Sequence, residues 1–178
     1  MKNLSKKMII IILTLFMFMG LVSCGSAKNV ASDLCNFVND NLADIQVKAN
    51  ETISQYNDYA SSDEMKPDEL LKLLQDSIIP TYQECIEQVE QLEPKTEEVK
   101  EIQTLYLDAS RKQLAALEKI AEGIITQDAV KYEEARDLTT ETESAFTRYY
   151  SQCKILATDN AVSLSGMENP VGVDQDEE

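Results

Sequence analysis

Four cysteines carry the most distinctive chemistry in this sequence: Cys24, Cys35, Cys85 and Cys153. A cysteine thiolate can be acylated, oxidised to a disulfide, or used as a metal ligand. Which of these reactions is open depends on the compartment that the chain reaches and on the element that carries each thiol. Cys24 stands apart because it directly follows an apolar N-terminal segment, whereas the other three lie in mixed polar and apolar sequence.

The segment before Cys24 has the layout of an export signal. Residues 1–7 contain three lysines and no acid, and the apolar run over residues 8–22 is shorter than the roughly 20 residues that span a bilayer. The run ends at Leu21-Val22-Ser23-Cys24, which resembles the lipobox of bacterial prolipoproteins. The resemblance implies removal of residues 1–23, a diacylglyceryl group on Cys24, and a chain anchored on the extracytoplasmic face of the cell membrane. The alternative is an uncleaved anchor or a signal without lipid.

The other three cysteines fall on apolar stripes of predicted helices. Cys35 and Cys153 lie at similar distances from the two turns predicted at one end of the molecule, counted along helices that we expect to be neighbours. We therefore predict that Cys35 and Cys153 can form a disulfide and that Cys85 is left over, because an exported chain meets oxidising conditions. Two alternatives stay open: a Cys35–Cys85 bond, or three free thiols packed as small apolar residues.

Most familiar catalytic machinery is missing from the sequence. Histidine is absent, which removes the usual general base and the commonest metal ligand. The few glycines form no phosphate-binding loop or dinucleotide motif. Acids are plentiful, but they fall at outward helical positions, where a solvated surface explains them. We expect no catalytic residues, no metal and no cofactor, and a carboxylate-based enzyme or metal carrier is the least favoured alternative.

The charge of the chain narrows the choice of partners. The formal net charge is −16, and removing the lysine-bearing signal makes the mature chain more negative still. Such a surface repels phosphate backbones and anionic lipid head groups, so we expect no nucleic-acid partner. It is compatible with cationic partners or with solubility alone.

Apolar residues recur at three- and four-residue steps over most of the mature chain, and no alternating pattern indicates a strand. Pro67 and Pro94 mark helix starts, Pro80 predicts a kink, and Thr126 is a plausible N-cap. The pattern predicts an all-α fold, an antiparallel up-down-up-down four-helix bundle with heptad-like packing. The predicted units are a tether over 24–30, a bundle over 31–158 with helices at about 31–60, 67–92, 94–124 and 127–157, and an acidic disordered tail over 159–178.

Two groups of side chains are candidates for recognition. Five residues converge at the predicted membrane-distal end and could form a partner surface or the last core layer: Tyr56, Tyr59, Ile124, Ile125 and Tyr132. Four polar residues interrupt the apolar stripes: Thr52, Gln113, Thr139 and Thr142. They could line a polar pocket, or the threonine hydroxyls could bond back to their own helices.

By its layout, the whole chain resembles the small helical-bundle lipoproteins of Gram-positive bacteria, a likeness that carries no functional residues with it. We expect a non-enzymatic binding module at the cell envelope, with an envelope or extracellular protein as partner. The alternative is a structural spacer or a protective lipoprotein, in envelope stress or phage exclusion.

Overall fold

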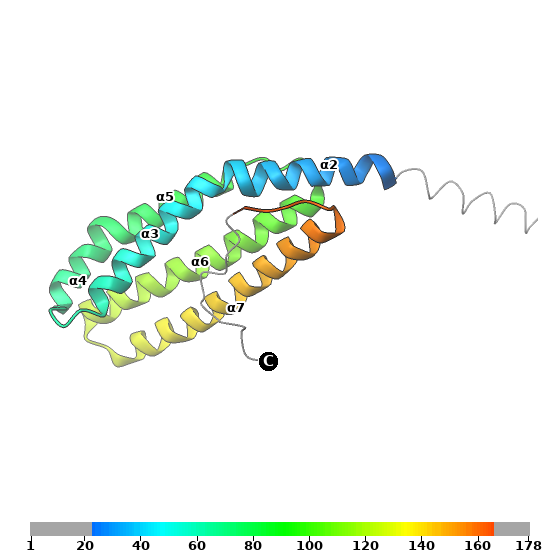
Figure 1. Cartoon of the computed structure of the whole chain (residues 1–178). Coiled ribbons are helices and arrows are strands. Elements are labelled where there is room, and N and C mark those ends of the chain that lie inside the picture. Colours follow the sequence, from blue (N-terminus) through cyan, green and yellow to red (C-terminus); the bar gives the residue numbers. More distant parts are fainter. Residues whose placement is uncertain (1–22, 166–178) are drawn as a thin grey trace, which may run out of the picture.

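The structure of the chain is a computed structural model that describes the backbone of residues 23–165 and the side chains of residues 29–165. Every regular element between residues 23 and 165 is a helix, so the predicted all-α class is confirmed (Figure 1). In chain order the elements are α2 (Ser23–Cys35), the π-helical turn η1 (Asn36–Asn41), α3 (Ala43–Ala60), α4 (Pro67–Leu73), the π-helical turn η2 (Leu74–Ile78), α5 (Ile79–Glu90), α6 (Glu97–Thr126) and α7 (Ala129–Asp159).

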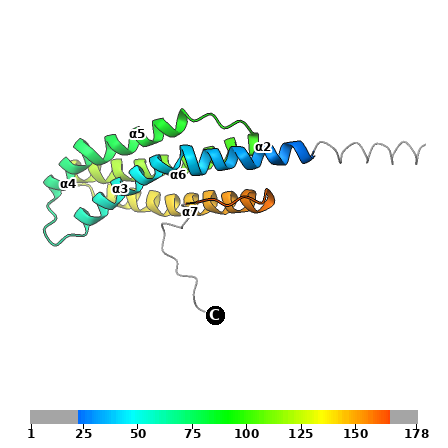
Figure 2. The ribbon, with the colours of Figure 1, turned by 45° about the horizontal axis from the view of Figure 1, so that its top comes forward.

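The helices lie lengthwise beside one another, with the connections at the two ends (Figures 1 and 2). The connections over residues 61–66 and 127–128 share one end, and the connection over residues 91–96 lies at the other. α6 and α7 form the most extensive contact, and α5 packs on both α3 and α6. By contrast, α3 and α7 make little direct contact. None of the helices within residues 23–165 combines the length and apolar character needed to cross a membrane.

The first helix begins earlier than the sequence predicts. Residues 24–30, expected to be a tether outside the bundle, belong to α2, which starts at Ser23. The signal peptide, predicted over residues 1–23, lies outside the described residues except for Ser23. The side chain of Cys24, where we predict the lipid, is outside the described part as well.

The turn η1 changes which face of this helix is buried. The Leu42 N–H donates to the Phe37 carbonyl at 2.8 Å, five residues back, so the turn holds one residue more than an α-helical turn. An uninterrupted heptad placed Cys35 on the buried face. With the extra residue, Leu34 and Phe37 are buried instead and Cys35 is only partly buried, which corrects the prediction for that position.

The helical path continues through Pro80, as the register of apolar residues predicts. Proline has no N–H to donate, and its ring crowds the carbonyl group four residues back, here that of Asp76. Asp76 lies within η2, and Pro80 follows in the first turn of α5. The widened π-helical turn accommodates the missing bond, so the helical path continues from Pro67 to Glu90.

The last two helices start and end a few residues later than predicted, because their caps differ from the expected ones. Asp128, not Thr126, caps α7: its Oδ1 accepts a hydrogen bond from the Val130 N–H at 2.9 Å. The Thr126 hydroxyl instead donates to the Glu122 carbonyl inside α6 at 2.8 Å. The N-cap residue of α6 is Thr96, and its N–H and that of Lys95 donate to Asp33 of α2.

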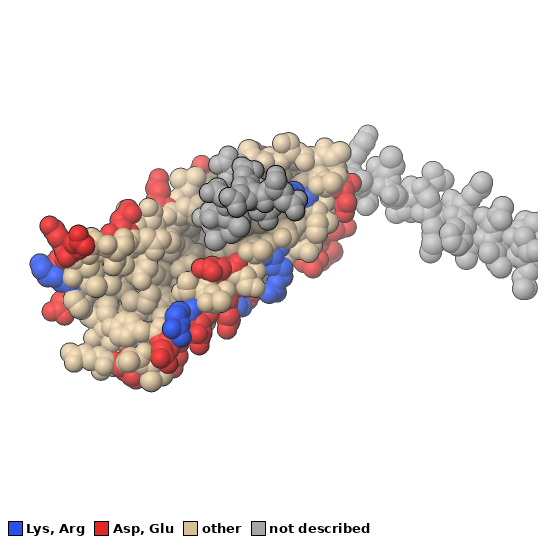
Figure 3. Space-filling model, turned by 60° about the horizontal axis from the view of Figure 1, so that its bottom comes forward, with Lys and Arg blue, Asp and Glu red and all other residues tan. Residues whose placement is uncertain are grey.

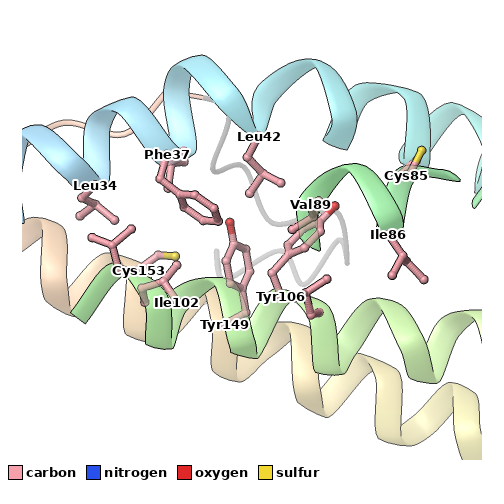
Figure 4. Packing of buried hydrophobic residues seen from close by; sticks show 14 of the residues in the cluster. Leu34, Phe37, Leu42, Cys85, Ile86, Val89, Ile102, Tyr106, Tyr149 and Cys153 are labelled. Atoms are coloured by element: carbon pink, nitrogen blue, oxygen red, sulfur yellow. The ribbon is translucent and has the colours of Figure 1, made fainter. Parts of the chain in front are cut away.

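The core consists of two clusters of buried side chains. The larger lies toward the α5–α6 connection and joins all the long helices; it includes Leu34, Phe37, Leu42, Val89, Ile102, Tyr106, Tyr149 and Cys153 (Figure 4). The smaller is formed by Leu70, Leu74, Ile78, Leu117 and Ala121. Residues Tyr56, Tyr59 and Ile124 pack against the smaller cluster, so they are part of the last core layer at that end.

Residues 160–165 fold back over the core after α7. Val162 and Leu164 pack against the larger cluster. The side-chain amide of Asn39 donates to the Ser163 carbonyl at 3.4 Å and its oxygen accepts from the Ser165 N–H at 2.9 Å. Apolar burial and these bonds therefore order the start of the segment that the sequence predicts to be disordered, 159–178, while residues 166–178 lie outside the described part.

Candidate functional site: a groove between α3 and α7

A groove of about 640 Å³ opens along the side of the molecule where α3 and α7 fail to pack together. Its walls come from α3 and α7, and α5 and α6 supply residues to its floor. The groove lies where the two core clusters meet, because Tyr82 and Tyr106 of the larger cluster and Leu117 of the smaller one all line it. Its volume falls in the range of small-molecule sites, which is roughly 300–1,000 Å³.

One bond crosses the groove between its two walls. Gln46 on α3 donates from Nε2 to the Tyr150 hydroxyl on α7 at 3.1 Å. This bond lies at the end of the groove nearest to the larger cluster, where Asn39 also ties the first helix to the segment after α7. The two walls are therefore joined on one side of the groove and separate beyond it.

Five aromatic residues from four helices line the groove: Tyr56, Tyr82, Tyr106, Phe146 and Tyr150. The rings of Tyr106 and Phe146 meet edge to face, with centroids 5.9 Å apart and planes at 75°. Phe146 also contacts Tyr150 along α7, at 6.4 Å between centroids. Tyr106 is further fixed by the ring of Tyr149 behind it, at 5.2 Å. The aromatic lining is thus held by packing and does not depend on a loop.

Burial keeps the groove tyrosines protonated. Tyr82 and Tyr106 are only 3 % and 4 % exposed, and burial raises the pKa of both hydroxyls well above the ordinary tyrosine value. The nearby Ser110 hydroxyl lowers both pKa values by a smaller amount. Burial also raises the pKa of Tyr150 to about 12, against the smaller lowering effect of Gln46. These groups are hydrogen-bond donors and acceptors at neutral pH, not bases.

The polar part of the lining is almost entirely uncharged. It consists of amide and hydroxyl side chains, and Glu143 is the single charged residue among those that line the groove. The hydroxyls of Thr139 and Thr142 donate to carbonyl groups of their own helix at 3.0 and 2.8 Å. The Thr52 hydroxyl does the same at 2.7 Å but does not line the groove. The structure thus combines the two alternatives for the polar residues on the apolar stripes. The threonine hydroxyls bond to their own helices, and Gln113, Thr139 and Thr142 also line the groove.

The five residues predicted as a distal partner surface divide into two sets. Tyr56, Tyr59 and Ile124 pack against the smaller core cluster, and the Tyr59 hydroxyl donates to Glu69 Oε2 at 2.9 Å. Ile125 and Tyr132 are 59 % and 44 % exposed. The Tyr132 ring lies over Gly123, where a Cβ atom would come within 3.1 Å of it. The structure therefore does not bring the five together as one exposed surface.

The predicted disulfide is not formed in the structure, where Cys35, Cys85 and Cys153 are all free thiols. Cys153 is fully buried in the larger cluster, and burial raises its thiol pKa to about 12. The Leu34 side chain points from the first helix into the core, on the side where Cys153 lies (Figure 4). The residue added by η1 thus places Leu34, and not Cys35, in the core cluster that contains Cys153.

On the face shown in Figure 3, acidic side chains are common along the edges, with basic side chains among them along the lower edge, and much of the visible surface toward the left of the view is uncharged. Among the described residues, no group of three or more Cys, Asp or Glu is placed to hold a metal ion. Near the α6–α7 connection, Lys119 and Lys131 each pair with both Glu122 and Glu134, at 2.7–3.3 Å. These pairs lower the pKa of the two glutamates and join the two helices.

Comparison of the chain with protein-family models, with curated proteins and with solved structures finds no match in any of the three. The groove is therefore interpreted from its own residues. Sequence reasoning singled out Tyr56, Gln113, Thr139 and Thr142 but missed Tyr82, Tyr106 and Tyr150 as site residues. One feature of the sequence could have indicated them: tyrosines recur on the buried apolar stripes. A tyrosine combines an apolar ring with a hydroxyl group, so it suits either the core or a ligand site.

Proposed function

We propose that this protein is a lipid-anchored lipoprotein on the extracytoplasmic face of the membrane that acts as a non-enzymatic binding module. Its helices are proposed to form an antiparallel up-down-up-down four-helix bundle with heptad-like packing, opened on one side by the groove between α3 and α7. The order of the connections and the lengthwise arrangement of the helices support this architecture. The lipobox-like segment ending at Cys24 supports the anchor.

The observation that carries the binding function is the composition of the groove. The groove is concave and combines aromatic and aliphatic side chains with amide and hydroxyl groups, a mixture that is typical of ligand sites between the helices of bundles. The polar groups that line it are amides, hydroxyls of protonated tyrosines, of two threonines and of Ser54, and one carboxylate. Carboxylate-based hydrolysis needs two carboxylates that flank a reacting bond. Within this lining Glu143 has no second carboxylate beside it, which favours binding over catalysis.

The proposed anchor places the groove at a distance from the membrane. Gln46 and Asn57, at the two ends of the α3 wall, follow Cys24 along a nearly continuous helix. At 1.5 Å per residue this corresponds to roughly 30–50 Å. A ligand outside the membrane surface could therefore reach the groove.

The first test is affinity capture with the full chain, processed and anchored in detergent micelles, from the envelope extract of its host. Two groove-filling variants, Ser54→Trp and Thr139→Trp, place a large ring at exposed positions on opposite walls. Their matched controls are Gln55→Trp and Thr140→Trp, exposed neighbours that do not line the groove. We expect a bound component that the groove variants lose and the controls keep.

Two other outcomes contradict parts of the proposal. If the captured component stays bound to both groove variants, the groove is not the site. Loss with Ile125→Asp alone then locates binding at the exposed end near Tyr132. If the folded wild-type chain retains nothing, the spacer or protective role replaces the binding module. Cys24→Ser tests the anchor separately: the variant is expected to leave the membrane fraction, and retention there contradicts lipid anchoring.

A further inference from the structure

The charges around the groove point to one class of ligand. No lysine or arginine lines the groove, although the chain contains 16 of these residues. Glu143 lines its α7 wall, is exposed, and takes part in no ion pair or side-chain hydrogen bond between described residues. The net charge of −16 adds a background that attracts cations. An anionic ligand would meet no compensating charge in the groove, whereas a cation would meet one.

The aromatic lining adds a second, independent preference. The π faces of tyrosine and phenylalanine attract ammonium groups within about 6 Å of a ring centroid, and the attraction grows when water is excluded. Tyr106 and Phe146 are held at a steep angle to each other, and Tyr82, Tyr150 and Tyr56 complete the lining. Tyr82 and Tyr106 are almost fully buried, whereas Tyr56, Phe146 and Tyr150 are partly buried, so the ring surface that faces the groove comes mainly from α3 and α7.

The polar atoms of the lining are suited to a ligand that also carries neutral hydrogen-bonding groups. The amides of Asn50 and Gln113 line the groove and make no side-chain hydrogen bond to another described residue. Each amide offers both donors and an acceptor. The hydroxyls of Tyr82 and Tyr106 are buried beside Ser110, whose Oγ has no hydrogen-bond partner of regular geometry in the described part of the chain.

We propose that the groove between α3 and α7 binds a small organic cation, whose ammonium group packs against the aromatic rings while Glu143 supplies the opposite charge. This inference rests on the proposed binding function and names its ligand class. A quaternary ammonium group with an uncharged polar arm fits best, because it has no N–H to satisfy among the rings and its arm can reach the amides.

The test is calorimetric titration of the full chain in detergent micelles with choline, with the bulkier benzyltrimethylammonium, and with 3,3-dimethylbutan-1-ol, the uncharged analogue of choline. We expect at least one of the two cations to bind, and the uncharged analogue to bind about tenfold or more weakly. Glu143→Gln should weaken cation binding severalfold and leave the analogue unaffected. Glu141→Gln, the same change at an exposed position on α7 outside the groove, should change neither.

A ring variant checks the aromatic contribution. Phe146→Leu keeps an apolar side chain on α7 but removes the π face, and it should weaken cation binding by about threefold to tenfold. Helix content measured by circular dichroism shows whether each variant remains folded. Equal affinity for choline and its uncharged analogue would overturn the cation inference but leave a binding groove. Failure of both cations to bind would also overturn it, and the capture experiment above then decides separately whether the groove binds anything.

Discussion

Asp33 on α2 holds the start of α6 through Thr96. Its Oδ2 accepts hydrogen bonds from the Thr96 N–H at 2.7 Å, from the Thr96 hydroxyl at 2.8 Å, and from the Lys95 N–H at 2.9 Å. The N–H groups at a helix start have no partner inside the helix, and a carboxylate is favoured there by the helix dipole. Asp33 is also buried. A residue distant in sequence therefore binds the two residues that lead into α6 and fastens α2 to that helix.

Replacing Asp33 should destabilise the fold because it leaves these donors without a partner. We expect Asp33→Ala to lower the free energy of unfolding by about 2–3 kcal/mol, and Asp33→Asn to lower it less, because an amide oxygen can still accept. Urea denaturation followed by circular dichroism measures both. Asp40→Asn, an exposed aspartate in η1, is the control and should have little effect. Equal stability of Asp33→Ala and the wild type would contradict this role.

Gln127 ends α6 in a left-handed conformation that favours glycine. Its φ is 55° and its ψ is 33°, where a side chain costs roughly 1 kcal/mol. Gln127→Gly should therefore raise the thermal midpoint. Gln91 ends α5 with φ −81°, so Gln91→Gly should instead lower it or leave it unchanged. Calorimetry measures the change in thermal midpoint for each variant. If both variants raise the midpoint, the left-handed backbone conformation of Gln127 is not the cause of its change.

Gly123 in the interior of α6 is explained by Tyr132. A glycine in a helix costs about 0.5–1 kcal/mol relative to alanine, but a Cβ atom here would come within 3.1 Å of the Tyr132 ring. We expect Gly123→Ala to stabilise the Tyr132→Ala variant by more than it stabilises the wild type. A double-mutant cycle in urea measures the difference. If the effects of the two substitutions on the free energy of unfolding are additive, the Tyr132 ring moves away from the new methyl group without an energetic cost.

The buried tyrosines should make the fold sensitive to alkali. Burial raises the folded-state pKa of Tyr82, Tyr106 and Tyr149 above the ordinary value of 10.0, and that of Tyr150 to about 12. The unfolded chain loses these protons near pH 10, so the stabilisation is complete below that pH and is lost as the pH rises toward the folded-state values. We expect these tyrosines to ionise together with loss of helix in a combined absorbance and circular-dichroism titration. Ionisation of all seven tyrosines near pH 10 with the helices intact would contradict it.

The Tyr149→Phe variant sharpens this test. The Tyr149 hydroxyl is buried without a hydrogen-bond partner of regular geometry among the described residues, and the Cys153 thiol is close to it. Removing an unpaired buried hydroxyl should stabilise the fold by about 1 kcal/mol and move alkaline unfolding to higher pH. A loss of stability would indicate that the hydroxyl has a partner.

Thiol reactivity should distinguish the three cysteines of the helical domain. Cys35 is only partly buried, whereas Cys85 and Cys153 are buried and burial raises the pKa of both thiols. Because the thiolate is the reactive form, we expect iodoacetamide to modify Cys35 in the folded chain and the other two only after unfolding. Peptide mapping without reduction identifies each site. A Cys35–Cys153 disulfide in protein from an oxidising compartment would restore the bond expected from the sequence.

Elements with a strong local signal could be predicted from the sequence, and those set by distant residues could not. The spacing of apolar residues and the positions of Pro67 and Pro80 were enough to predict the helices and the continuation through Pro80. The start of α6 was misplaced because Asp33, the side chain that holds its N-cap residue Thr96, lies far away in the sequence. The burial of Leu34 in place of Cys35 was missed because the π-helical turn that rotates this face has no proline to mark it.

The sequence by itself therefore determined the all-α class, the approximate helices and the polar character of Gln113, Thr139 and Thr142, since these depend on local periodicity and residue type. Only the tertiary structure decided that α3 and α7 separate beyond the Gln46–Tyr150 bond. That separation places a groove over Tyr82 and Tyr106, which periodicity alone assigns to the core and which remain almost fully buried at its floor. The physical reason is that a side chain's burial depends on which helices pack across from it, and that packing is settled by the sum of contacts along the whole molecule.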